Sequence, residues 1–134
     1  KVSISEEIEH IREYISLEKI RFKDSLKVSF KTSVLDPNFE IPPMLFIPFI
    51  ENIFKHGSII DGYLSTSICI ESNTNQLIFS SKNSYQEKHK NTAPIGLGLE
   101  NSEKRLKLLY GNSYSLETTT VKEAYCVYLV INTI

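Results

Sequence analysis

The chain has few cysteines, almost no net charge and no long hydrophobic run, and each shortage excludes a class of protein. Its two cysteines, Cys69 and Cys126, lie far apart among apolar neighbours. This excludes a disulfide-rich fold and a clustered cysteine metal site, so we interpret both as small buried hydrophobic side chains in a cytosolic protein. A formal net charge of -1 argues against nucleic acid as a partner. No segment approaches the roughly 20 apolar residues of a membrane span, and none resembles a signal peptide.

The rest of the composition is that of an ordinary soluble globular protein. Hydrophobic residues make up 41% of the 134 positions and charged residues 23%, which suits one domain over residues 1–134. Because the sequence starts without methionine and enters a helix almost at once, we expect a fragment of a longer protein.

Periodicity predicts the order helix, strand, helix, two strands, loop, helix and two strands. The expected elements are helices over residues 1–23 and 97–110, a central helix that stops at Gly57, and strands over 26–33, 65–72, 76–83, 114–120 and 124–132. Residues 84–95 lack apolar periodicity and predict a long loop of the kind that often forms a lid. Hairpins outnumber crossovers, so we predict an α/β (α+β) two-layer sandwich. Its mixed, mostly antiparallel sheet would have about five strands, with about three helices on one face.

Residues 42–57 predict an oily helix with a polar end. Pro42 and Pro43 suit a loop that leads into a helix, and apolar residues then recur at helical spacing and indicate one broad buried face. The last turns gather a carboxylate, an amide, a cation and an imidazole: Glu51, Asn52, Lys55 and His56. Such a helix is either exposed at this end or holds a ligand there.

A glycine pair before the last helix is the second candidate feature. Gly96 and Gly98 would let the backbone approach a ligand closely, and the following helix N-terminus offers free N–H groups to an anion. A simple turn is the alternative. The spacing matches neither the dinucleotide-binding fingerprint nor a Walker loop.

In this order and spacing, the motifs resemble the ATP-binding catalytic domain of sensor histidine kinases, a Bergerat-fold (HATPase) domain, and most of all the LytS type. The resemblance spans nearly the whole chain and rests on three stretches, residues 6–22, 42–57 and 96–106. It implies that the opening helix leads into an ATP-binding domain and that residues 84–95 form the ATP lid.

The resemblance also implies roles for residues of the central helix. Asn52 matches the asparagine whose side-chain oxygen coordinates Mg²⁺, and Lys55 matches a cation that contacts phosphate, so these two would carry catalysis. His56 matches an aromatic position near the nucleotide. A solvated or structural side chain is the alternative for all three. Glu51 is either a neighbour of the Mg²⁺ site or a plain surface acid.

The remaining implied site residues come from the second half of the chain. Asn83 falls where the family normally has an aspartate that accepts the adenine amino proton, and an asparagine carbonyl is a neutral, weaker acceptor. The residues that match the phosphate-cradling segment are Gly96, Leu97, Gly98 and Leu99. Asn101 and Arg105, on the helix behind it, either reach the phosphates or fasten the lid.

The function implied by the resemblance is that of a protein-histidine kinase in a two-component signal transduction system. Such a domain binds ATP and Mg²⁺ and transfers the γ-phosphoryl group to a histidine, here one outside the chain, in a helical domain of the same protein or its dimer mate. The fragment alone would then be inactive in autophosphorylation. A response regulator would act downstream, and we expect a cytoplasmic domain of a bacterial inner-membrane sensor, with no membrane contact of its own.

Pro48 and Asn83 define the alternatives. Relatives that hydrolyse ATP have a carboxylate one helical turn before the Mg²⁺ asparagine, and Pro48, which occupies that position, cannot act as a general base. An ATPase or serine-directed kinase on this fold is therefore disfavoured, as it is by the opening helix. The residues from Asn83 to Tyr85 depart from the motif that the family usually has at this place. This departure leaves open a degenerate nucleotide-binding or dimerisation scaffold on the same fold.

Overall fold

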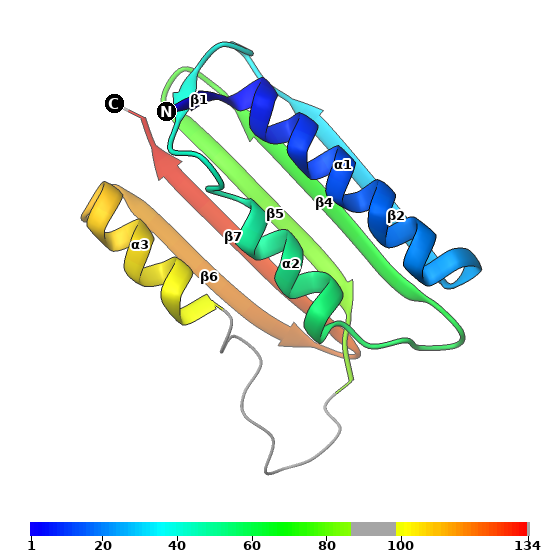
Figure 1. Ribbon diagram of the computed structural model, residues 1–134. Coiled ribbons are helices and arrows are strands. Elements are labelled where there is room, and N and C mark those ends of the chain that lie inside the picture. The colour runs from blue at the N-terminus through cyan, green and yellow to red at the C-terminus, as the bar shows by residue number, and fades with distance from the viewer. Residues whose placement is uncertain (87–98, 134) are drawn as a thin grey trace.

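The computed structural model describes residues 1–86 and 99–133, which form two layers (Figure 1). In chain order, the elements are β1 (Val2–Ser3), α1 (Ile4–Phe22), a short 3-10 turn η1 (Lys23–Ser25), β2 (Leu26–Ser33), β3 (Glu40–Ile41), α2 (Ile47–His56), β4 (Leu64–Ser72), β5 (Gln76–Ser84), α3 (Glu100–Tyr110), β6 (Tyr114–Val121) and β7 (Ala124–Asn132). Among these described residues, no helix is both long and apolar enough to cross a membrane.

One five-stranded sheet forms the back layer, in the order β2-β4-β5-β7-β6. β2 and β4 pair in parallel, and the other three neighbouring pairs are antiparallel. The three helices α1, α2 and α3 lie side by side on one face of this sheet (Figure 1). The predicted fold class is confirmed: a mixed, mostly antiparallel five-stranded sheet with three helices on one face.

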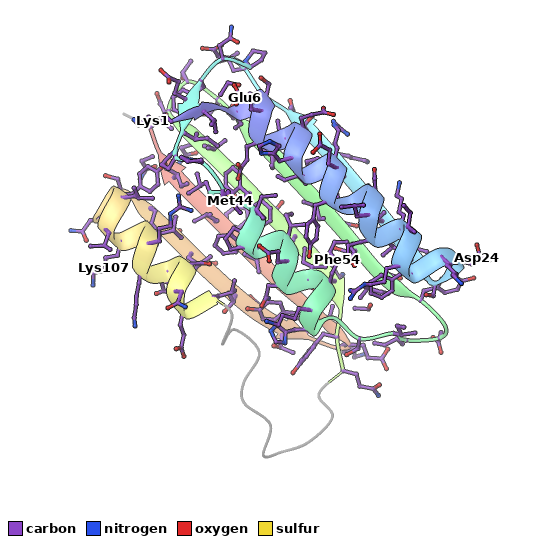
Figure 2. The ribbon with its side chains drawn as sticks, in the orientation of Figure 1. Lys1, Glu6, Asp24, Met44, Phe54 and Lys107 are labelled. Atoms are coloured by element: carbon purple, nitrogen blue, oxygen red, sulfur yellow. The ribbon has the colours of Figure 1, made fainter. Side chains whose placement is uncertain are left out.

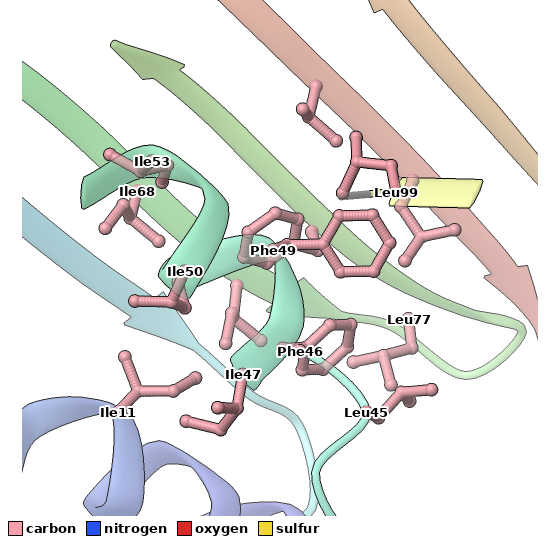
Figure 3. Packing of buried hydrophobic residues seen from close by; sticks show 14 of the residues in the cluster. Ile11, Leu45, Phe46, Ile47, Phe49, Ile50, Ile53, Ile68, Leu77 and Leu99 are labelled. Carbon is pink, nitrogen blue, oxygen red and sulfur yellow. The ribbon is translucent and has the colours of Figure 1, made fainter. Parts of the chain in front are cut away.

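The core lies between the sheet and α2, the central helix. Phe46, just before α2, stacks on Phe79 of β5 with ring centroids 5.3 Å apart, and Phe49 meets the same ring at 5.5 Å. Figure 3 shows both rings pointing from this stretch toward the sheet, with Leu99 in the same cluster. Burial of these large side chains removes apolar surface from water and fixes α2 over the middle of the sheet.

The two cysteines correct one prediction. Strand side chains alternate between faces, and Ile68 and Ile70 point into the core, so Cys69 between them faces outward. Tyr125 and Val127 of β7 also point into the core, so Cys126 between them faces outward as well. Both thiols are free and only partly buried, on the face without helices.

Some element boundaries differ from the sequence prediction. Val2 pairs with Ile41 and Ser3 with Glu40 in a two-stranded sheet that periodicity did not predict, because strands this short carry no pattern. Ser84, where a loop was expected to begin, is the last residue of β5. The helix expected from residue 97 is described from Glu100, while most of the predicted lid lies outside the described residues.

Candidate functional site

α2 supplies a buried amide whose oxygen has no hydrogen-bond partner in the described part of the chain. The apolar side of α2 packs on the core, and the buried residues of this helix include Asn52, which is only 5% exposed. The Oδ1 atom of Asn52 has no hydrogen-bond partner in the described structure. Lys55 on the next turn is exposed and His56 is half-buried, so the last turn of α2 opens to solvent.

The sheet adds four more buried oxygens that have no hydrogen-bond partner among the described residues. Thr66, Asn83 and Tyr125 form one row across β4, β5 and β7, since Thr66 pairs with Asn83 and Asn83 with Tyr125. Ser81 lies two residues before Asn83 on the same, helix-facing side of β5. The Thr66 and Ser81 hydroxyls, the Asn83 Oδ1 atom and the Tyr125 phenol are buried without hydrogen bonds to described residues. Burial raises the pKa of the Tyr125 phenol above its ordinary value of 10.0, against a smaller lowering by the nearby Thr118 side chain, so the phenol is protonated at neutral pH.

These oxygens point to a binding site. Leaving a buried polar atom unpaired costs free energy, and native proteins rarely do so without a reason. In the described residues six side-chain atoms are in this condition, and the only one outside the set of Asn52, Thr66, Ser81, Asn83 and Tyr125 is Oε2 of Glu18. That oxygen has an ion pair with Arg21 at 2.8 Å, so the uncompensated atoms are those on α2 and the sheet.

Asn83 presents an acceptor rather than a donor. Its Nδ2 atom donates to the Ser84 carbonyl at 3.0 Å, which orients the amide, and Oδ1 accepts no hydrogen bond from any described residue. A ligand group that donates a hydrogen bond would satisfy it.

Gly57 brings the end of α2 against Asn83. A Cβ atom at this position would lie 2.5 Å from the Ile53 carbonyl, 2.6 Å from Leu64 Cδ1 and 3.2 Å from Asn83 Nδ2. The φ angle of Gly57 is -63°, which any residue adopts. Glycine is therefore required here for close approach and not for the left-handed conformation that usually stops a helix.

Hydrogen bonds tie the end of β5 to the segment after α2. Ser58 N–H donates to the Ser84 carbonyl at 2.9 Å, and the Ser84 hydroxyl donates to the Ser58 carbonyl at 2.6 Å. The Gln86 N–H donates to the Ser58 hydroxyl at 2.9 Å. Beyond them, the Tyr85 ring meets Tyr125 edge-on with centroids 6.2 Å apart. This network fixes the strand that carries Asn83.

The structure brings only part of the predicted set together. Asn52 and Asn83 are both buried at this end of the molecule, and Leu99, buried at the start of α3, joins the core beside α2. Asn101 is exposed. Arg105 donates from Nη1 to the Met44 carbonyl at 2.8 Å and from Nη2 to the Pro43 carbonyl at 2.6 Å, so its guanidinium holds the segment before α2. Gly96, Leu97 and Gly98 lie outside the described residues.

Sequence reasoning missed Thr66, Ser81 and Tyr125. A signal was present for the first two, because each is a polar residue at an inward strand position beside an apolar inward neighbour, Ile68 for Thr66 and Phe79 for Ser81. Tyr125 gave no such signal, since a tyrosine in a strand is ordinary.

Comparisons with known proteins agree on the fold. No family model matches the chain. It is 29% identical over 128 residues to the sensor histidine kinase BtsS of Escherichia coli (strain K12), an alignment that covers 92% of this chain and 22% of BtsS. The catalytic domain of histidine kinase ThkA superposes with a TM-score of 0.67 at 13% identity, covering 98% of this chain and 95% of that domain. The chain has the fold of a histidine kinase catalytic domain.

A second structure with the histidine kinase fold was determined with a nucleotide analogue. Full-length ShkA in complex with AMPPNP matches with a TM-score of 0.65 at 12% identity, over 97% of this chain and 30% of ShkA. ThkA is also known in complex with the response regulator protein TrrA. The present chain spans about a fifth of the length of BtsS. On this histidine kinase fold, the buried unpaired oxygens and the polar end of α2 together form the candidate site.

Proposed function

We propose that the chain is the ATP-binding catalytic domain of a LytS-type sensor histidine kinase, and that it transfers the γ-phosphoryl group of ATP to a histidine outside it. The observation that carries this proposal is a set of five buried oxygens that find no hydrogen-bond partner among the described residues of a histidine kinase fold, at Asn52, Thr66, Ser81, Asn83 and Tyr125. A domain that served only as a scaffold would gain nothing from leaving them unsatisfied.

The row across the sheet suits an adenine base. The Asn83 Oδ1 atom is oriented as an acceptor and would take a hydrogen bond from the exocyclic amino group of adenine. The hydroxyl of Thr66 and the protonated phenol of Tyr125, its neighbours in the row, can donate as well as accept. Because Asn83 is neutral, its bond to the base is weaker than that of a carboxylate.

The end of α2 suits Mg²⁺ and phosphate. Mg²⁺ takes oxygen ligands and is usually held by few protein groups together with substrate phosphates, which fits the Asn52 oxygen that no described residue pairs. When bound, the ion would neutralise charge on the transferred group. Lys55, exposed on the same helix, would contact phosphate, with His56 beside the nucleotide. Gly96, Leu97, Gly98 and Leu99 would cradle the phosphates.

The chain's contribution to the reaction is positioning. The bond from the γ-phosphorus to the oxygen that bridges it to the β-phosphorus breaks as a bond to an imidazole nitrogen forms in line, and ADP leaves. Pro48, one helical turn before Asn52, offers no base to activate a water molecule. Hydrolysis is therefore slow, and phosphoryl transfer to histidine is favoured.

The rest of the proposed system lies beyond this chain. The phospho-accepting histidine belongs to a helical domain of the same protein or of its dimer mate, and the phosphoryl group passes on to a response regulator. The whole protein is a bacterial inner-membrane sensor with this domain in the cytoplasm.

Isothermal titration of the chain with AMPPNP, with and without Mg²⁺, tests the binding step. Saturable binding that requires Mg²⁺ supports the proposal, whereas absence of binding favours a degenerate scaffold on the same fold. Phosphoryl transfer is tested by incubating the full-length protein with radiolabelled ATP. An acid-labile, alkali-stable label is expected of phosphohistidine, and a full-length protein that binds nucleotide but takes up no label would contradict the kinase assignment.

A further inference from the structure

The segment from Pro43 to Phe46, directly before α2, is held from two sides by charged side chains of the other two helices. From α1, the Glu7 carboxylate accepts the N–H of Met44 at 3.0 Å and that of Phe46 at 2.8 Å, one with each oxygen. From α3, Arg105 donates to the carbonyls of Met44 and Pro43. Figure 2 shows Met44 at this junction, at the N-terminal end of α2.

The Glu7 side chain has no role at the surface, because it is 0% exposed. Burial of a carboxylate is costly unless it is hydrogen-bonded, and charge-assisted bonds to two N–H groups provide this compensation. The positive end of the α2 dipole lies at the same place and favours an anion. Glu7 also lies in the first turn of α1, within the stretch of residues 6–22 on which the family resemblance rests.

The backbone at Met44 is in a conformation that neighbouring elements impose. Its φ angle is +59°, in the left-handed region that non-glycine residues rarely adopt, although its side chain is 52% exposed. Such a conformation persists where the surroundings determine it. Glu7 accepts the N–H of Met44 and Arg105 donates to its carbonyl, and these two hydrogen bonds hold the backbone in this conformation.

The held segment joins two elements of the proposed nucleotide site. α2 begins at Ile47 and carries Asn52, and α3 begins at Glu100, directly after the glycine-containing segment. We infer that Glu7 and Arg105 are positioning residues of this site, which together set the placement of Asn52 relative to the first turn of α3. This inference rests on the proposed Mg-nucleotide binding.

Four variants of the 134-residue chain test the inference. Glu7→Gln keeps the size of the side chain but leaves only one acceptor for two N–H groups, and Arg105→Gln removes the fork that spans two carbonyls. Glu6→Gln and Lys107→Gln are matched controls, because both side chains are exposed on the same two helices (Figure 2). The affinity for Mg–AMPPNP is measured by calorimetry, and that for adenosine, which lacks phosphates, by NMR shift changes.

In Glu7→Gln and in Arg105→Gln we expect Mg–AMPPNP to bind about tenfold more weakly, which corresponds to a loss of about 1.4 kcal/mol in binding free energy. The affinity for adenosine should stay within about twofold of the wild-type value. Both controls should stay within about twofold for each ligand. A double variant that combines Glu7→Gln with Arg105→Gln should lose less Mg–AMPPNP affinity than the product of the two single fold-losses, since both residues hold one segment. Equal losses for adenosine and Mg–AMPPNP would indicate general loss of structure and overturn the inference.

Two further measurements keep the test decisive. If Glu7→Gln does not fold, Arg105→Gln decides together with hydrogen exchange, which should become faster at the Met44 and Phe46 amides. Arg105→Lys keeps the charge but not the fork, so near-normal Mg–AMPPNP affinity in this variant would indicate a direct phosphate contact and overturn positioning. Normal affinity in a folded Arg105→Gln would overturn it as well. A wild-type chain that binds no Mg-nucleotide would overturn the proposed function and this inference with it.

Discussion

Replacing Asn52 with leucine should raise the stability of the chain and abolish its Mg²⁺-dependent binding of nucleotide. Asn52 is 5% exposed, and its Oδ1 atom is buried without a partner among the described residues. Leaving such an acceptor unpaired costs about 1–3 kcal/mol, and an apolar group of the same shape removes that cost. Leucine is close to asparagine in size, so we expect no large cavity.

Because the side-chain NH₂ group is lost as well, we take the low end of this range. The free energy of unfolding should rise by about 1 kcal/mol, which corresponds to roughly 4 °C in Tm for a domain of this size. Binding of AMPPNP should lose its dependence on Mg²⁺, because leucine offers no oxygen to a hard cation. A structural role alone would instead lower stability.

Thermal unfolding without ligand and calorimetry with and without Mg²⁺ measure the two effects in one preparation. Asn112→Leu is the matched control, because Asn112 is exposed in the turn after α3 and its substitution should leave Tm within about 1 °C. A loss of 1 kcal/mol or more in Asn52→Leu would refute the reasoning, since it would mean that the amide makes stabilising bonds within the fold. Unchanged Mg²⁺ dependence would refute the ligand assignment.

Three other outcomes follow from the site. Gly57→Ala places a Cβ 2.5 Å from the Ile53 carbonyl and should lower stability in chemical unfolding by about 1–3 kcal/mol, whereas an unchanged midpoint would show that the backbone shifts freely. Asn83→Asp should tighten ATP binding in calorimetry by about 1 kcal/mol through a charged acceptor, and weaker binding would contradict the proposed base contact. Because burial raises the pKa of Tyr125, stability should fall as pH rises above the ordinary tyrosine pKa of about 10, and Tyr125→Phe should flatten that decline in alkaline unfolding curves.

Local patterns in the sequence determined most of the secondary structure. The strand Leu26–Ser33 lies where the alternation of apolar and polar residues predicts it, because the side-chain period of a strand is a property of the chain itself. The position of α2 after two prolines and the burial of its apolar residues are equally local. The same periodicity drew attention to Asn52, a polar residue on an oily helix.

Only the tertiary structure decided which polar residues meet. Thr66, Asn83 and Tyr125 come from three strands, and their alignment depends on strand order and register. Glu7 and Arg105 reach the same backbone segment from positions 37 to 62 residues away. Such contacts leave no periodic trace, because they are set by how helices and strands pack and not by the residues next to them in the chain.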